Sequence, residues 1–160
     1  MALGTIANRQ GRVAGINLGG GYATFPGVVG TAITKVCHTE VARTGLGARE
    51  ADAAGFGWVA ARIETTSVAG YFPGAGSVTV KLLAERGTGR LLGGQIVGAP
   101  GSAKRIDTLA TALTAGMSVF DLVDLDLAYA PPFSSVWDLV QVAARRAAAE
   151  VVSDRGGAWG

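Results

Sequence analysis

Three apolar, β-branched segments separated by short glycine-containing loops most constrain the fold. Residues 58–68 and 78–86 flank the loop YFPGAG, and the second segment leads through Gly-Thr-Gly at 87–89 into residues 90–97. Connections this short join neighbouring strands that run in opposite directions. Residues 78–86 and 90–97 are therefore predicted to form an antiparallel hairpin. Residues 58–68 are predicted to form a strand of the same sheet.

The glycine pattern GTGRLLGG, at residues 87–94, superficially resembles a dinucleotide-binding fingerprint. It lacks glycine at the sixth position, and it precedes a predicted strand instead of opening a helix. We therefore interpret it as the turn of the hairpin.

The remaining periodicities predict one further strand and several helices. Residues 31–44 are rich in β-branched side chains and indicate a strand, bent near His38. Strands in the middle of a chain followed by helices predict an α+β fold, an antiparallel sheet with helices packed on one side. The helices are expected at residues 6–18 with Thr5 as N-cap, 48–54, 102–116 with Ser102 as N-cap, 119–125, and from Ser134 or Ser135 onward.

Charge and hydropathy exclude two classes of partner. Lys and Arg number 14 against 12 Asp and Glu, and only 16% of residues are charged, so the chain does not resemble a nucleic-acid-binding protein. The adjacent pairs Lys104-Arg105 and Arg145-Arg146 are expected to lie on solvated helix edges. The uncharged stretch 13–34 contains six glycines and a proline, which argues against a membrane helix. No secretory signal pattern is present, and this predicts a cytoplasmic protein.

The chain has one cysteine, Cys37, and one histidine, His38. This composition excludes an intrachain disulfide, and the pair alone is too small a ligand set for zinc. We expect a buried thiol beside a surface imidazole; a small enzyme with Cys37 as nucleophile is the alternative. The carboxylates of Asp121, Asp124 and Asp126 lack the spacing of a calcium loop and are expected on a solvated helix edge, so no metal site is predicted.

Two tyrosines in loops are the strongest functional candidates. Tyr71, in AGYFPGAG, and Tyr129, in LAYAPPFSS, both lie near prolines, which stiffen the backbone. Each phenol offers an apolar ring and one hydroxyl that can donate or accept a hydrogen bond. From the residues alone, packing of both rings at a domain edge is the favoured interpretation.

Four motifs carry a family resemblance. The segments ANRQGRVAG, GVVGTAITKVCHTEVARTGL, AGYFPGAG and YAPPFSSVWD resemble, in this order, the C-terminal part of flavin-dependent pyridine nucleotide-disulfide oxidoreductases. The nearest branch is that of coenzyme A-disulfide reductases and NADH oxidases or peroxidases. The N-terminal FAD segment, redox cysteine and NAD(P)-binding domain of that family are not in this chain. Departures from its motifs are Cys37, His38 and Leu139.

The resemblance implies a domain organisation. Residues 1–20 would be the last helix of the FAD-binding domain, 21–30 a glycine-rich connection, 31–153 the dimerisation domain and 154–160 a frayed tail. Because most of the cofactor-binding parts lie elsewhere, the chain alone is expected to bind no cofactor and not to be catalytic.

The resemblance also assigns roles in an intact parent enzyme, which would use FAD and NAD(P)H. Leu3, Gly4 and Thr5 would face the flavin. Tyr71 and Tyr129 would act across a homodimer interface, near the partner subunit's redox cysteine and a disulfide or CoA-type substrate. A free-standing homodimeric binding or scaffold protein derived from the same domain is the alternative.

Overall fold

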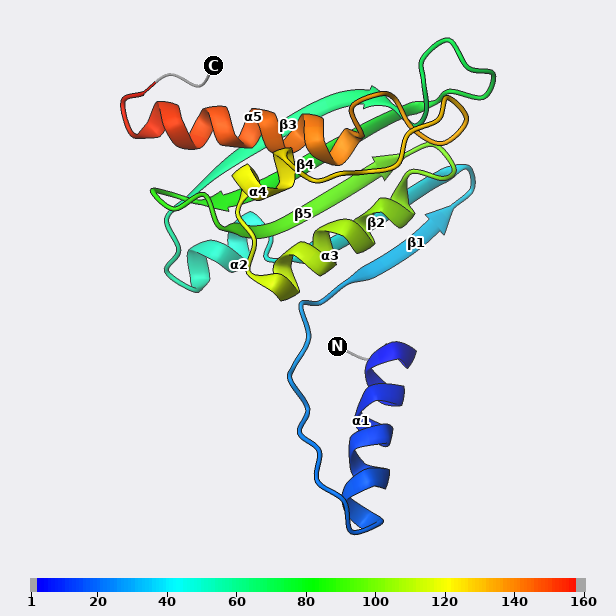
Figure 1. Ribbon diagram of the computed structural model, residues 1–160, viewed down its shortest axis with the longest axis vertical. Helices are drawn as coiled ribbons and strands as arrows, with labels where there is room; N and C mark the ends of the chain where they lie inside the picture. The colour runs from blue at the N-terminus through cyan, green and yellow to red at the C-terminus, as the bar shows by residue number, and fades with distance from the viewer. Residues whose placement is uncertain (1–2, 158–160) are drawn as a thin grey trace.

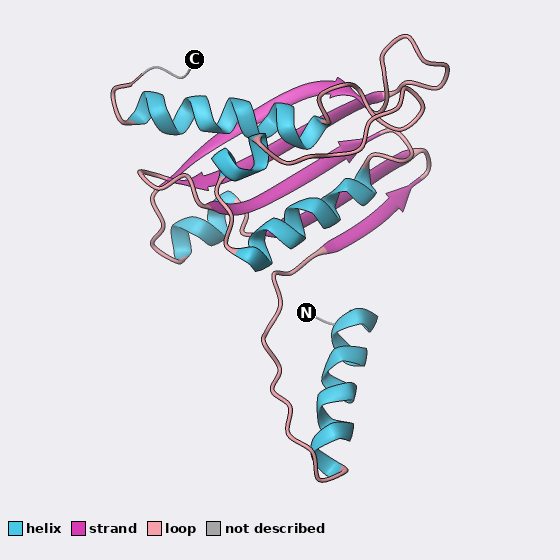
Figure 2. Cartoon of the chain, in the orientation of Figure 1, coloured by secondary structure: helices cyan, strands magenta, loops and turns pink. Residues whose placement is uncertain are grey.

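A five-stranded antiparallel sheet forms the centre of the molecule (Figures 1 and 2). The structure is a computed structural model of the chain and describes residues 3–157. The strands lie in the order β1-β2-β5-β4-β3, and all neighbouring pairs are antiparallel. Their bounds are β1 Ala32–Val36, β2 Thr39–Gly45, β3 Trp58–Thr66, β4 Ser77–Glu85 and β5 Leu91–Gly98.

The main core lies between the sheet and three helices, α3 (Ile106–Ala115), α4 (Val119–Val123) and α5 (Leu139–Asp154), which cover one face in Figure 1. Alternation along the strands supplies the apolar side of this core, because successive side chains point to opposite faces. Val78, Val80 and Leu82 of β4 are fully buried there. The predicted α+β fold is confirmed.

A smaller apolar cluster lies on the opposite face. The short helix α2 (Ala48–Ala53) buries Ala51 against Leu83 and Leu92. Leu83 follows Leu82 in β4 and therefore points away from the main core. One helix thus covers one end of the face that was expected to be free of helices.

The first strand was predicted as one bent element, but it is a hairpin. β1 and β2 pair from Ala32 with Arg43 to Val36 with Thr39, which leaves only Cys37 and His38 in the turn. Cys37 has a positive φ of 53°, unusual for a residue with a side chain, and it is exposed. The prediction of a buried thiol was wrong, because this residue forms the tip of a hairpin and not the middle of a strand. The hairpin predicted between β4 and β5 is confirmed.

Two helix starts differ from the prediction. Ser102 precedes a 3₁₀ turn, η1 (Ala103–Arg105), and its hydroxyl donates to the carbonyl of Ala99, so it does not cap the helix that follows. The last helix begins at Leu139 and not near Ser134, because Asp138 is its N-cap and accepts a hydrogen bond from Val140 N–H at 2.8 Å.

Helix α1 (Gly4–Leu18) stands apart from the sheet and buries none of its residues. Its N-cap is Leu3 and not Thr5, so the helix begins two residues before the predicted start. The chain then turns back beside the helix, as Figure 1 shows, and the amide side chain of Asn17 holds this turn through two hydrogen bonds to the backbone of Ala23. Within residues 3–157, none of the helices is long and apolar enough to cross a membrane.

At the other end, α5 runs to Asp154, and residues 158–160 of the predicted frayed tail lie outside the described residues.

Candidate functional site

Two loops that are distant in sequence meet at one end of the sheet. The segment between β3 and β4 carries Tyr71, and the segment between α4 and α5 carries Tyr129 (Figure 1). The backbone N–H of Ala69 donates to the carbonyl of Pro131 at 3.3 Å and joins them directly. Ala69 is itself buried, so this contact lies inside the molecule, beneath the surface of the two loops.

The two tyrosines predicted as site residues are brought together. The phenols of Tyr71 and Tyr129 lie within hydrogen-bonding reach of each other, and this contact raises the pKa of Tyr129, because it favours the neutral form. Both rings remain open to solvent: Tyr71 is 77% exposed and Tyr129 is 45% exposed. The expectation that each ring packs at a domain edge therefore does not describe them.

Each loop is closed by its own hydrogen bonds. Ser67 donates its N–H to the carbonyl of Gly76 at 2.8 Å and accepts at its hydroxyl from the N–H of Gly76 at 3.2 Å, which joins the two ends of the Tyr71 loop. In the second loop, the N–H groups of Phe133 and Ser134 both donate to the carbonyl of Ala130 and form a tight turn after Tyr129. The tyrosines therefore project from folded loops.

Further apolar side chains are exposed beside Tyr129 in the sequence. Phe133 is 73% exposed, Val136 is 67% exposed and Trp137 is half exposed. The guanidinium carbon of Arg145 lies 5.2 Å from the centre of the Trp137 ring, a cation–π contact. We call Tyr71, Tyr129, Phe133, Val136 and Trp137 the aromatic loop patch. Large apolar side chains exposed together are a feature of surfaces that contact another molecule.

Leu3, Gly4 and Thr5 lie on a different part of the molecule. They form the start of α1 and, with Ile33 of β1 and Lys104 of η1, line a groove of about 570 Å³. The first turn of α1 contains no acidic residue and Leu3 makes no side-chain cap. The N–H groups of a helix start favour an electron-rich group. These residues thus fit one edge of a bound flavin, but one helix start encloses little of a cofactor.

The other sequence candidates are not assembled into a site. Within residues 3–157, no three His, Cys, Asp or Glu side chains are grouped as metal ligands. Asp121 instead accepts hydrogen bonds from the backbone and hydroxyl of Ser118, which lower the pKa of its carboxyl group and cap α4. In the same described range, no hydrogen bond or ion pair activates the exposed Cys37.

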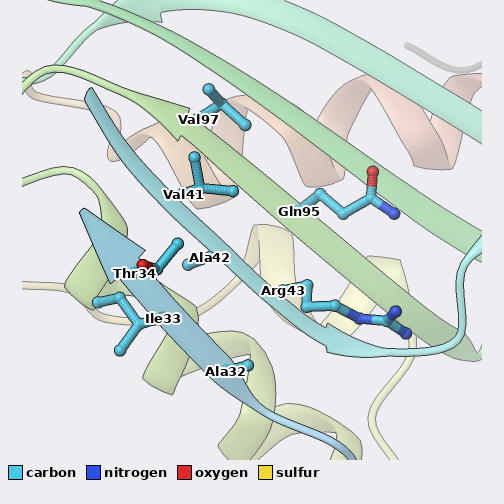
Figure 3. Close-up of a pocket in the computed structure, with 8 residues that line it drawn as sticks. All are labelled: Ala32, Ile33, Thr34, Val41, Ala42, Arg43, Gln95 and Val97. Carbon is cyan, nitrogen blue, oxygen red and sulfur yellow. The ribbon is translucent and has the colours of Figure 1, made fainter. Parts of the chain in front are cut away.

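A shallow hollow of about 380 Å³ lies over β1, β2 and β5 (Figure 3). Its polar side chains offer no nucleophile paired with a base, and the Arg43 guanidinium is held by Glu50 at 2.5 Å and by the carbonyl of Gly45 at 3.0 Å. The hollow therefore suits a packing contact better than catalysis. Its lining consists of Ala32, Ile33, Thr34, Val41, Ala42, Arg43, Gln95 and Val97.

Residues 31–140 match the family described as pyridine nucleotide-disulphide oxidoreductase, dimerisation domain. The fold is consistent with this match, since the matched range contains the whole sheet and both tyrosine loops. The chain belongs to this family, and it corresponds to the C-terminal part of such an oxidoreductase.

Named relatives narrow the comparison. The chain is 43% identical over 143 residues to a CoA-dependent NAD(P)H sulfur oxidoreductase of Pyrococcus furiosus. The aligned region covers 89% of this chain and 32% of the relative. The structure of an NAD-dependent persulfide reductase from A. fulgidus superposes with a TM-score of 0.91 at 43% identity, covering 94% of this chain and 28% of that one. The chain therefore spans about a third of the length of the curated relatives it matches.

A third similar protein is a solved structure whose description names its cofactor. An FAD-dependent pyridine nucleotide-disulphide oxidoreductase from Desulfovibrio vulgaris has 32% identity and a TM-score of 0.74. It covers 93% of this chain, and this chain covers 33% of it.

One polar cluster beneath the tyrosine loops was missed in the sequence. Of the adjacent pair Lys104 and Arg105, both expected on a solvated helix edge, only Lys104 is solvated, with a side chain 79% exposed. The side chain of Arg105 is 16% exposed and is paired with Asp138, which is 11% exposed. The prediction for Arg105 was wrong because one turn of 3₁₀ helix rotates it into the molecule. The sequence contains no spacing motif that predicts the pairing of Arg105 with Asp138, since the two residues lie 33 positions apart in separate elements.

Proposed function

We propose that this chain is the dimerisation part of an FAD-dependent, NAD(P)H-using oxidoreductase that reduces a disulfide or persulfide of the CoA type. In this proposal two copies associate, and the Tyr71–Tyr129 pair of one protomer acts beside the reactive sulfur of its partner. The observation that carries the proposal is the hydrogen-bonded tyrosine pair, exposed on two joined loops of a domain from a dimerisation family.

The chemistry of the pair suits sulfur reduction. Cleavage of a disulfide or persulfide releases a thiolate, which is stabilised by a hydrogen-bond donor or by a proton. A phenol with the ordinary pKa of 10.0 is protonated at neutral pH, and because the contact with Tyr71 raises the pKa of Tyr129, its hydroxyl can act as a hydrogen-bond donor. Each phenol carries one proton, and either hydroxyl can donate it to a sulfur atom while the other supports it.

The flavin would lie elsewhere on this chain. Bound FAD supplies electron transfer from NAD(P)H to the sulfur substrate in this chemistry. The residues proposed to contact it are Leu3, Gly4 and Thr5, whose helix start would favour a reduced, anionic flavin. The chain alone is not proposed to be catalytic, because the redox cysteine and nicotinamide site would be supplied by other parts of the intact enzyme.

A chimeric enzyme tests the role of the tyrosines. This chain replaces the matching third of the Pyrococcus furiosus relative, and the two half-reactions are followed by rapid mixing. Tyr129→Phe should slow the sulfur-dependent half-reaction about tenfold or more, as expected for loss of one charge-assisted hydrogen bond of about 1.5–3 kcal/mol. Reduction of the flavin by NAD(P)H should be unchanged, because it needs neither phenol.

Tyr22→Phe is the matched control, since Tyr22 lies in the connection after α1 and is 89% exposed. It should leave both half-reactions unchanged. Equal slowing of both half-reactions by Tyr129→Phe would indicate a folding or dimer defect. An unchanged sulfur half-reaction would contradict the proposed role of the pair.

A further inference from the structure

The side chain of Arg105 contacts both tyrosine loops from beneath. Its NH2 nitrogen donates to the carbonyl of Ser67 at 3.0 Å, at the base of the Tyr71 loop, and also to the carbonyl of Phe133 in the Tyr129 loop. Its Nε donates to Asp138 Oδ2 at 2.8 Å, at the end of the same loop. One planar guanidinium thus binds both loops at once, a geometry that a lysine ammonium on its flexible stem does not reproduce.

The surroundings of Arg105 make these contacts specific. Its NH1 nitrogen donates to the carbonyl of Gly101 at 3.0 Å, which anchors the guanidinium to the turn that precedes η1. Its charge is balanced by Asp138, whose Oδ2 also accepts from the Ser134 hydroxyl at 3.1 Å. Ser67, Ser134 and Asp138 are all buried. Hydrogen bonds to a charged group are stronger in such a site than in solvent. If the guanidinium were removed, the buried carboxylate of Asp138 would lose its charge partner, which would reduce the stability of the fold.

The direct bonds between the two loops are few. Within residues 3–157, besides the bonds of Arg105, they are the bond from the Ala69 N–H to the Pro131 carbonyl and the contact between the two exposed phenols. The phenol pair faces solvent, so water competes with its hydrogen bond. The Arg105 side chain is only 16% exposed, and its guanidinium is therefore the contact best placed to keep the loops in register.

We infer that Arg105 is a positioning residue that holds the Tyr71 and Tyr129 loops together so that the tyrosine pair stays formed. The benefit to catalysis rests on the function proposed above, whereas the positioning itself is a property of this chain. Arg105 acts through the backbone of Ser67 and Phe133 and through Asp138, and its hydrogen bonds in the described part of the chain do not include either phenol.

Nuclear magnetic resonance on the full 160-residue chain tests the positioning directly. Arg105→Lys retains the charge beside Asp138 but loses the fork of donors to Ser67 and Phe133. We expect hydrogen exchange of the Ala69 amide to accelerate about tenfold or more, because this amide bridges the loops. The nuclear Overhauser contact between the rings of Tyr71 and Tyr129 should weaken or disappear.

Three controls separate local positioning from general stability. Exchange of the Val80 amide, in the centre of β4, should change far less than that of Ala69. Arg146→Lys should change neither amide, since Arg146 forms an exposed pair with Glu150 on α5. Asp138→Asn keeps an acceptor for the α5 cap but removes the charge that orients Arg105, and it should shift the same signals in the same direction. It also provides the test if Arg105→Lys does not fold.

The outcomes distinguish this inference from the proposed function. An unchanged Ala69 amide and ring contact in a folded Arg105→Lys chain would overturn the positioning role, as would equal acceleration at Ala69 and Val80. In the chimeric enzyme, Arg105→Lys combined with Tyr129→Phe should be no slower in the sulfur half-reaction than Tyr129→Phe alone, because both act through one pair. Additive slowing there would also overturn it, whereas failure of Tyr129→Phe to slow the reaction would overturn only the proposed function.

Discussion

The carboxylate of Glu40 in β2 accepts a hydrogen bond from the backbone N–H of Ala103 at 3.1 Å and so joins the sheet to the start of η1. It also accepts from the N–H of Gly101 at 3.0 Å. These two bonds, that from Ala103 first, lower the pKa of the Glu40 carboxyl group from its usual 4.5. Glu40 therefore supplies the acceptor that the capping residue Ser102 was expected to supply.

Stability should depend on pH through Glu40. Because its pKa is lower in the folded state, the stabilisation is present above pH 4.5 and is lost as the pH falls through the folded-state pKa. Glu40→Gln should reduce the free energy of unfolding at neutral pH by about 0.5–1 kcal/mol, the usual range for such a cap. Urea unfolding of both chains at neutral pH and at about pH 3 measures this, and the difference should shrink at acid pH. A difference that does not depend on pH would contradict the role of the carboxylate charge.

Most elements could be predicted from local patterns, because helices and hairpins pair backbone groups that are close in sequence and present a regular apolar face to the core. The alternation in β4 and the glycines at 87 and 89, both with positive φ, were sufficient for the β4–β5 hairpin. The β1–β2 hairpin was missed because Cys37 and His38 are not usual turn residues. Pairing with the rest of the sheet imposes that turn.

The candidate site was less accessible to sequence reasoning. Tyr71 and Tyr129 stood out by their position in loops beside prolines, but only the family resemblance gave them a role, since the residues alone favoured packing at a domain edge. Their hydrogen bond depends on two loops meeting, and this in turn involves Arg105 and Asp138. Tertiary contacts of that kind have no periodicity or spacing in the sequence, and they also moved the start of α5 to Leu139.

Two glycines with positive φ should differ sharply in their tolerance of alanine. Gly45 has a φ of 66°, and a Cβ there would lie 2.3 Å from the carbonyl oxygen of Leu92. Gly74 has a φ of 88° but no heavy atom within 4 Å of such a Cβ. Gly74→Ala should cost about 1–2 kcal/mol from the backbone conformation alone. Gly45→Ala should cost about 2–5 kcal/mol, because steric overlap adds to that strain. Urea unfolding provides both values, and equal losses would show that the sheet relaxes around residue 45.

The isolated chain should form a homodimer. Its composition is 49% hydrophobic and 16% charged, and the aromatic loop patch leaves large apolar side chains in solvent. Burial of such a patch against a second copy removes apolar surface from water, and a twofold contact closes the assembly. Sedimentation at micromolar concentration should show about twice the chain mass of 16.1 kDa. A monomer across that range would contradict the prediction.

The same isolated chain should bind neither FAD nor NAD(P)H and should be colourless when purified. The start of α1 offers a flavin a few backbone N–H groups, whereas cofactor sites enclose most of the surface of their ligand. The groove beside Leu3, Gly4 and Thr5 is about 570 Å³, and α1 contributes only these first residues to its lining, so it would leave most of a dinucleotide in water. Titration of FAD followed by flavin fluorescence should show no saturable quenching, and an NADH titration should give the same result. Tight, saturable binding of either cofactor would show that this chain holds a more complete site than its helix start provides.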